Sequence, residues 1–197
     1  MKASAMRPSV PGSPIRRVGR LAGALSVISS MISSVILSVI PLAGCATASQ
    51  PASSPATFVV VRHAEKVDDS RDPPLAPAGT ARAQRLAVAM HDEAVVAVYA
   101  TPFLRTQQTA AAIATDHRLA IIPYPVDQSA TALAAQLRSR HDTGTVLVVG
   151  HSNTAPGIAA ALCSCDATPL DDSQYGRVYR IRIGADGRGV LQESILP

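Results

Sequence analysis

Five side chains suited to phosphate chemistry follow short apolar segments of the sequence, at positions where buried strands would end. They are Arg62, His63, Arg105, Asp127 and His151. Guanidinium groups bind phosphate oxygens through paired hydrogen bonds, and a neutral imidazole is a competent nucleophile at neutral pH. A second, protonated imidazole adds positive charge at the transferring group, and a carboxylic acid can protonate the leaving oxygen. The set predicts phosphoryl transfer.

Neither a Gly-rich phosphate loop nor a cluster of carboxylates for Mg²⁺ is present in the sequence. In many phosphotransfer enzymes metal ions neutralise the charge of the phosphate. Arginines and histidine would supply that positive charge in this chain. We therefore expect a reaction that uses no metal and no other cofactor.

The sequence alternates between short apolar runs and segments with helical periodicity. Strands are predicted at 58–61, 95–100, 120–122 and 146–149, and helices at 80–91, 103–115, 129–140 and 155–163. Two further strands, 178–183 and 190–195, flank a turn at 184–187. This order predicts a three-layer α/β sandwich with a mostly parallel central sheet, to which the last pair could add an antiparallel edge.

Ligands of open α/β sheets bind at the edge where the carboxyl ends of the strands meet. Four separate strand ends would bring the two arginines, the two histidines and the aspartate to this one edge. The sequence therefore predicts that the five residues form one site.

Three segments carry most of these residues. They are Arg62-His63-Ala64-Glu65-Lys66, Ala100-Thr101-Pro102-Phe103-Leu104-Arg105-Thr106 and Val149-Gly150-His151-Ser152-Asn153-Thr154. In this order, after predicted strands, they resemble the three signatures of the histidine phosphatase superfamily, which has the phosphoglycerate-mutase-like fold. The resemblance implies that His63 is the phosphorylated nucleophile and that Arg62, Arg105 and His151 bind the phosphoryl oxygens. It also implies a general acid near the end of the third strand, where Asp127 stands.

The sequence departs from the fuller family pattern at several positions. Ala64 stands where glycine is usual, and Lys66 and Asp69 stand where a threonine and an asparagine often touch the phosphate. The acid is an aspartate rather than a glutamate in a clear motif, so Glu65 is a rival for that role, or it holds an arginine in place. The acidic segment 67–75 is expected to border the pocket.

Three other functions fit parts of this pattern. Gly150-His151-Ser152-Asn153-Thr154 resembles the nucleophile elbow of α/β-hydrolases, but no histidine follows His151 to serve as the base that such a triad needs. A phospho-ligand binding lipoprotein would not need the nucleophile His63. A phosphomutase usually covers its intermediate with a longer segment, for which this chain has little room. Hydrolysis of a small phosphorylated substrate or a phosphoprotein is therefore the preferred prediction.

The first 44 residues have the features of a secretory signal peptide. Five basic residues and no acidic one precede an uncharged segment from Leu21 to Ala43, which ends in Leu42-Ala43-Gly44-Cys45. This ending resembles a bacterial lipobox and implies lipidation of Cys45; an uncleaved transmembrane helix is the alternative. We expect a signal peptide at 1–44, a flexible tether at 45–56 and the phosphatase domain at 57–197. The domain would face the periplasm or the cell exterior, in contact with the membrane only through its anchor.

The positive net charge of +4 comes from this leader. Without the leader, 13 Lys and Arg remain against 14 Asp and Glu. The charge therefore does not indicate a nucleic-acid partner.

Cys163 and Cys165 are separated by a single residue. An exported protein meets an oxidising compartment, but a disulfide closing so short a loop would be strained. We expect two unpaired small residues near a helix end.

Overall fold

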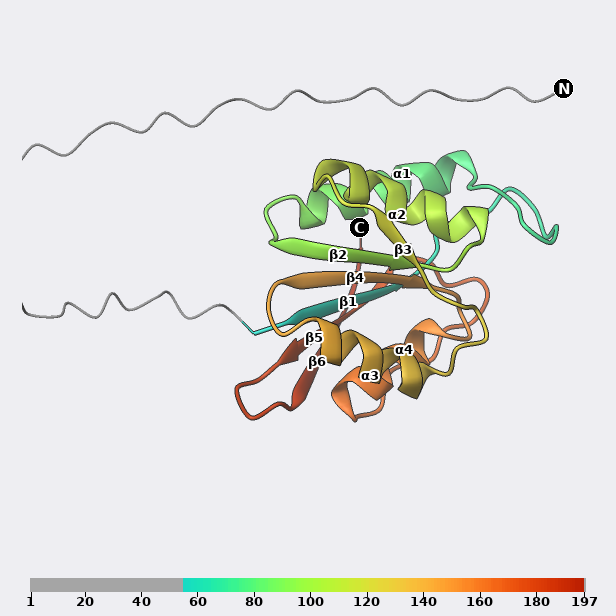
Figure 1. Cartoon of the computed structure of the whole chain (residues 1–197). Helices are drawn as coiled ribbons and strands as arrows, with labels where there is room; N and C mark the ends of the chain where they lie inside the picture. Colours follow the sequence, from blue (N-terminus) through green and yellow to red (C-terminus); the bar gives the residue numbers. More distant parts are fainter. Residues whose placement is uncertain (1–54, 197) are drawn as a thin grey trace, which may run out of the picture. The chain divides into compact units, whose positions relative to one another are not determined.

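The computed structural model describes residues 55–196 (Figure 1). The predicted signal peptide, Cys45 and the predicted tether up to residue 54 lie outside the described residues. The last two residues assigned to the tether already pack with the domain. Pro55 forms a β-bridge with Thr143, and Ala56 is only 2% exposed. In the described part of the chain, no helix is both long and apolar enough to span a bilayer.

A six-stranded sheet lies at the centre of the domain, in the order β3-β2-β4-β1-β5-β6. The strands are β1 (Thr57–Arg62), β2 (Val95–Ala100), β3 (Ile121–Pro123), β4 (Thr145–Gly150), β5 (Arg177–Ile183) and β6 (Gly189–Ile195). The first four run parallel, and β5 pairs antiparallel with both β1 and β6. This mostly parallel sheet with an antiparallel edge confirms the predicted fold class.

Four helices cover the two faces of the sheet. They are α1 (Pro77–Met90), α2 (Leu104–Asp116), α3 (Ala130–Arg140) and α4 (Ala155–Cys163). Helices α1 and α2 lie over one face, and α3 and α4 lie over the other, which makes the three layers (Figure 1). Helix α1 begins earlier than the predicted residue 80, because a proline at the first helical position has a suitable φ and needs no N–H partner.

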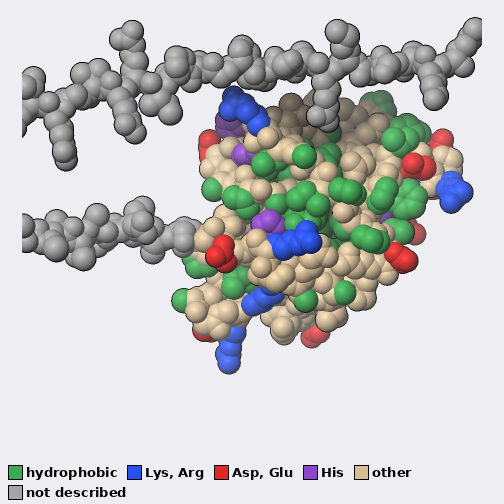
Figure 2. All heavy atoms as spheres, in the orientation of Figure 1, with side chains coloured by type: hydrophobic (Ala, Val, Ile, Leu, Met, Phe, Trp, Pro, Cys, Tyr) green, Lys and Arg blue, Asp and Glu red, His purple; other side chains and the backbone are tan. Residues whose placement is uncertain are grey.

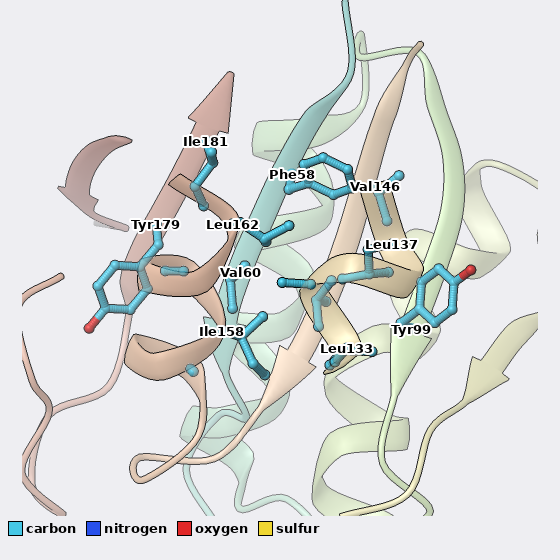
Figure 3. Packing of buried hydrophobic residues seen from close by; sticks show 14 of the residues in the cluster. Phe58, Val60, Tyr99, Leu133, Leu137, Val146, Ile158, Leu162, Tyr179 and Ile181 are labelled. Atoms are coloured by element: carbon cyan, nitrogen blue, oxygen red, sulfur yellow. The ribbon is translucent and has the colours of Figure 1, made fainter. Parts of the chain in front are cut away.

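The parallel strands are buried on both faces. On one face, Val59 and Leu147 pack in a cluster that includes Ile113 of α2. On the other face, Phe58 and Val146 pack against α3 and α4 (Figure 3). Burial on both sides explains why β1 and β4 carry continuous apolar runs rather than an alternation of apolar and polar residues.

The register of the sheet brings three strand ends together. Arg62 pairs with Gly150, and Ala100 pairs with Val149. The backbone N–H of His63 donates to the Gly150 carbonyl at 2.9 Å, which continues the ladder past the end of β1. The residues that follow β1, β2 and β4 therefore leave the sheet at the same edge.

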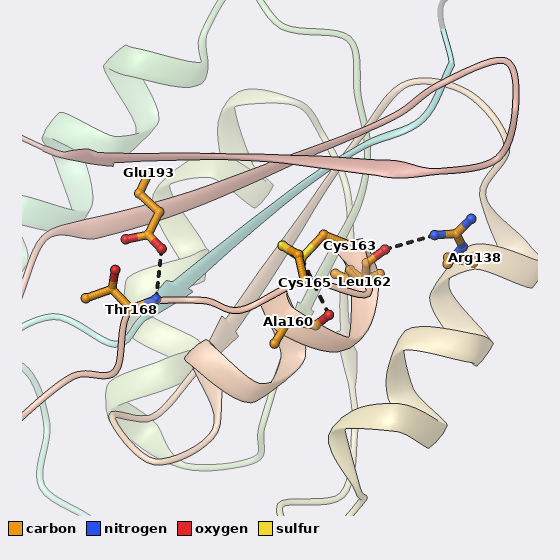
Figure 4. The surroundings of a disulfide bond; sticks show 7 residues. All are labelled: Arg138, Ala160, Leu162, Cys163, Cys165, Thr168 and Glu193. Carbon is orange, nitrogen blue, oxygen red and sulfur yellow. Dashed lines mark hydrogen bonds between the residues drawn. A yellow bond between two sulfur atoms is a disulfide. The ribbon is translucent and has the colours of Figure 1, made fainter.

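A disulfide joins Cys163 and Cys165, which corrects the expectation of two unpaired residues (Figure 4). The reason is Ser164, the residue after α4, which has a left-handed φ of 54°. This conformation turns the chain back on itself, so that the two Cα atoms lie 5.2 Å apart, well within the span of a disulfide. The length of the loop alone does not predict this turn.

Charged side chains of both signs are interspersed on the face shown in Figure 2. Within the described residues, that face has no extended basic surface of the kind that binds nucleic acid.

Candidate active site

A pocket of about 390 Å³ lies at the edge of the sheet where the parallel strands end. Four of the five predicted site residues line it: Arg62, His63, Arg105 and His151. They come from the ends of β1 and β4 and from the first turn of α2. Residues far apart in the chain therefore meet in one basic pocket, as the parallel topology predicts.

His63 is held in a defined orientation by its own backbone neighbour. Its ring nitrogen Nδ1 lies 2.8 Å from the Ala64 carbonyl oxygen, which can only accept a hydrogen bond. The proton of the neutral ring is therefore on Nδ1, and the lone pair is on Nε2. The backbone N–H of Ala64 is in turn fixed by Thr109 Oγ1 at 2.9 Å, which ties this segment to α2.

Burial keeps His63 neutral. Desolvation lowers the pKa of His63 from 6.5 to about 4, and the hydrogen bond to Ala64 opposes this shift. The neighbouring His151, Arg62 and Arg105 contribute to this lower pKa. At neutral pH the imidazole of His63 is therefore unprotonated at Nε2, which is the form that a nucleophile requires.

Arg62 is held in place by hydrogen bonds to the loop that joins α4 to β5. Its Nη1 donates to three carbonyl oxygens, those of Asp171 at 3.1 Å, Asp172 at 3.0 Å and Gln174 at 2.9 Å. The guanidinium also lies 4.0 Å from the ring centroid of Tyr175. These contacts fix one edge of the guanidinium group, while Nε has no hydrogen-bond partner among residues 55–196.

His151 is oriented by two threonines. Its Nε2 lies 3.0 Å from Thr101 Oγ1, and that hydroxyl lies 2.8 Å from Thr106 Oγ1. Because Thr106 offers a second partner, the Thr101 hydroxyl can either accept from Nε2–H or donate to Nε2. The pair therefore holds the ring in one orientation in either protonation state.

The surroundings of His151, which is expected to be protonated when it acts on the transferring group, lower its pKa. Burial, together with the charges of Arg105 and Arg62, lowers the pKa of His151 from 6.5 to about 4. A bound phosphate would supply the negative charge that favours protonation of this ring.

Arg105 projects from the first turn of α2 and contacts the acidic loop after β1. Its guanidinium lies 4.3 Å from the ring centroid of Phe103 and 3.8 Å from a carboxylate oxygen of Asp72. Burial lowers the pKa of Arg105 and Asp72 opposes this shift, so the group stays charged at neutral pH. The expected loop 67–75 does border the pocket, through Asp69 and Ser70.

Neither predicted acid lines the pocket. Asp127 is exposed and outside the lining, although its neighbour Val126 is part of it. Glu65 binds Arg82 through three contacts of 2.6 to 3.0 Å, and that hydrogen bond lowers the pKa of the Glu65 carboxyl. Glu65 therefore has the alternative role considered from the sequence, which is to hold an arginine.

The loop between α4 and β5 supplies residues that sequence reasoning missed. Asp172 and Tyr175 line the pocket, and the same loop binds Arg62. Neither residue follows a strand, so the expectation that site residues lie at the carboxyl ends of strands does not identify them. The only sequence signal is the polar run Asp171-Asp172-Ser173-Gln174-Tyr175 just before a predicted strand.

In the described part of the chain, no three His, Cys, Asp or Glu side chains are placed to hold a metal ion. Positive charge in the pocket comes from Arg62, Arg105 and Lys66. Lys66 forms an ion pair with Asp69, and these two of the residues that depart from the family pattern both line the pocket.

The α/β fold, with its mostly parallel six-stranded sheet and four helices, is similar to phosphoglycerate-mutase-like structures. Phosphoglycerate mutase from Bacillus anthracis str. Sterne superposes with a TM-score of 0.58 at 14% identity, over 72% of this chain and 93% of that one. Residues 58–129 match the family model described as histidine phosphatase superfamily (branch 1). No curated protein matches the sequence.

Two further solved structures are similar to this chain. The protein histidine phosphatase SixA complexed with tungstate has a TM-score of 0.58 at 19% identity, over 71% of this chain and 96% of that one. A protein named as phosphohistidine phosphatase SixA, from Nakamurella multipartitia, has a TM-score of 0.55 at 26% identity, over 71% and 95%. The family match and these neighbours support a phosphatase-type enzyme.

Proposed function

We propose that this chain is a phosphatase that hydrolyses a phosphomonoester or a phosphoramidate through a phosphohistidine at His63, without a metal or cofactor. The observation that carries this proposal is the hydrogen bond between His63 Nδ1 and the Ala64 carbonyl. It leaves the Nε2 lone pair available in a pocket shared with two arginines and a second histidine.

The reaction proceeds in two steps. Nε2 of His63 forms a bond to phosphorus as the bond from phosphorus to the leaving group breaks. Arg62, Arg105 and His151 bind the equatorial oxygens, where the charge of the transition state is spread. Water then forms a new bond to phosphorus as the phosphorus–nitrogen bond breaks, which releases phosphate and restores neutral His63.

The preorganisation of the phosphate binders supports this mechanism. Arg62 is fixed by three carbonyls before any ligand binds, and His151 is fixed by Thr101. Donors that do not have to reorganise during the reaction stabilise the transition state most effectively. Asp127 remains a prediction as the general acid, and its exposed position outside the pocket lends that role no support.

The pocket and the similar structures support two candidate classes of substrate. The described part of the chain has no large segment inserted over the pocket, so a phosphate carried by a protein could reach His63 as well as a small molecule. Two similar structures are named as phosphatases of phosphohistidine or of protein histidine, which supports a phosphoramidate as one candidate substrate.

The test is hydrolysis of an aryl phosphate by the full chain and by His63→Ala, in the presence of EDTA. We expect turnover by the wild type that EDTA does not change, and background turnover in the variant because the nucleophile is lost. His91→Ala, on an exposed histidine at the end of α1, is the matched control and should keep full activity.

Two results would contradict the proposal. Normal turnover by His63→Ala would exclude this residue as the nucleophile, and loss of activity with EDTA that a divalent metal restores would exclude a metal-free reaction. Binding of phosphate without turnover of an aryl phosphate or a phosphoramidate would favour the alternative of a phospho-ligand binding lipoprotein. Transfer of the phosphoryl group to a second hydroxyl of the substrate would favour a phosphomutase.

We also propose that the protein is exported and held to a membrane by a lipid on Cys45. The basic and apolar leader and the segment Leu42-Ala43-Gly44-Cys45 support this proposal. The disulfide between Cys163 and Cys165 supports it independently, because disulfides persist mainly in oxidising compartments.

A further inference from the structure

The two carboxylates that line the pocket differ in their partners. One, Asp69, forms an ion pair with Lys66, so a cation next to it balances its charge. The other, Asp172, lies in the loop between α4 and β5 and accepts a hydrogen bond from Ser152 Oγ at 2.8 Å. Asp172 is therefore the pocket carboxylate whose cationic neighbour is the phosphate-binding residue Arg62 rather than a lysine.

Asp172 is tied to the phosphate-binding groups at both its backbone and its side chain. Its carbonyl accepts from Arg62 Nη1 at 3.0 Å, and its carboxylate lies 3.8 Å from Arg62 Nη2. Ser152, which holds the carboxylate, directly follows His151. Any phosphate bound by Arg62 and His151 would therefore lie close to this carboxylate.

A carboxylate at this position would repel a phosphate dianion. Two negative charges that share one site favour a proton on one of them. A carboxyl group beside the bound phosphate can donate a proton to a leaving group, and as a carboxylate it can accept one from water. The side chain is 94% exposed, so it is accessible both to a leaving group and to an incoming water molecule.

We propose that Asp172 is the general acid and base of this site. In the first step the bond from phosphorus to the leaving oxygen breaks, and that oxygen takes the proton from the Asp172 carboxyl. In the second step water attacks the phosphohistidine and gives a proton to the Asp172 carboxylate, which returns the group to its starting state. This assignment rests on the proposed phosphatase activity of the His63 pocket.

The experiment compares aryl phosphates with good and poor leaving groups. Dinitrophenyl phosphate needs little protonation of its leaving oxygen, whereas phenyl phosphate needs much more. In the full chain, we expect Asp172→Asn to lower kcat/KM for phenyl phosphate by about 100-fold or more and to change that for dinitrophenyl phosphate by less than about threefold. Asparagine retains the oxygen that accepts from Ser152, so the loop should keep its position.

Two further variants make the test specific. Asp166→Asn is the matched control, because Asp166 is exposed in the same loop and does not line the pocket, and it should leave both substrates unaffected. Asp127→Asn tests the rival acid. Equal slowing of both substrates by Asp172→Asn, no change in either, or a selective loss in Asp127→Asn instead would overturn the assignment.

Failure of the phosphatase proposal itself would look different. It would appear as a wild type that is inactive with both dinitrophenyl phosphate and a phosphoramidate, or as full activity in His63→Ala. Either result would remove the basis for assigning Asp172. Wild-type turnover that depends on His63, without a selective effect at Asp172, would overturn the role of Asp172 alone.

Discussion

At the scale of single residues, the chemistry depends on which nitrogen of each histidine is free. The Ala64 carbonyl leaves Nε2 of His63 free, and the Thr101 hydroxyl leaves Nδ1 of His151 free. Both rings are neutral at neutral pH because burial lowers each pKa to about 4. One neutral ring can therefore attack phosphorus, and the other can take up a proton when phosphate binds.

Thr101 is predicted to act as a positioning residue for His151. Thr101→Val removes the hydroxyl partner of Nε2 and leaves a buried ring nitrogen unpaired, which costs about 1–3 kcal/mol. We expect kcat/KM for an aryl phosphate to fall by about 10- to 100-fold. The measurement is the pH profile of kcat/KM. The apparent pKa in that profile that reflects titration of His151 should shift.

The conservative variant separates positioning from packing. Thr101→Ser keeps the hydroxyl and should restore most of the activity and the original pH profile, whereas Thr131→Val at an exposed site on α3 should change neither. An unchanged pH profile in Thr101→Val, or no recovery in Thr101→Ser, would show that the threonine acts through packing alone.

At the scale of secondary structure elements, the site depends on how closely α1 approaches the segment after β1. Gly79 in α1 faces the backbone of Glu65, and a Cβ at this position would lie 2.2 Å from the Glu65 carbonyl oxygen. A bulkier residue must therefore displace either the helix or the segment that carries His63. Gly157 in α4 differs, since a Cβ there would meet only the Ala130 Cβ at 3.6 Å.

These two glycines give a matched pair of substitutions. We expect Gly79→Ala to lower the free energy of unfolding by about 1–3 kcal/mol and to reduce kcat/KM, because overpacking shifts the backbone next to His63. Gly157→Ala should be neutral or stabilise by up to about 1 kcal/mol, because alanine favours the helix. Denaturant unfolding and aryl phosphate hydrolysis measure both effects. A Gly79→Ala variant as stable and active as Gly157→Ala would contradict the close approach of α1 to the segment after β1.

At the scale of the whole molecule, the proposed anchor would confine the enzyme to a membrane surface. In that arrangement the open pocket would meet substrates outside the cytoplasm. The segment that decides this question, including Cys45, lies outside the described residues. Its assignment therefore stays a prediction from the sequence.

Cys45→Ser tests the anchor. We expect the variant to lose incorporation of radiolabelled palmitate into the protein during growth, because the thiol that carries the lipid is absent. Cys165→Ser is the control, since this cysteine pairs with Cys163 in the domain, and it should still be labelled. Palmitate labelling that persists in Cys45→Ser would rule out the lipobox, and an unprocessed but membrane-bound wild type would favour the uncleaved helix.

The fold class and most of the basic pocket could be predicted from the sequence. Runs such as Phe58–Val61 and Val146–Val149 identify buried parallel strands, because only strands covered on both faces are apolar throughout. Once the strands are parallel, their carboxyl ends must share an edge. Arg62, His63 and His151 could therefore be placed together without coordinates.

The residues that reach the pocket from outside this pattern could be identified only from the three-dimensional structure. Asp172 and Tyr175 come from a loop whose path depends on packing against Arg62, and no local periodicity encodes such a path. Local periodicity likewise does not encode the pairing of Glu65 with Arg82 or the turn at Ser164 that brings two cysteines together. Strand ends follow from local pattern and topology, whereas loop contacts depend on the three-dimensional packing of distant segments.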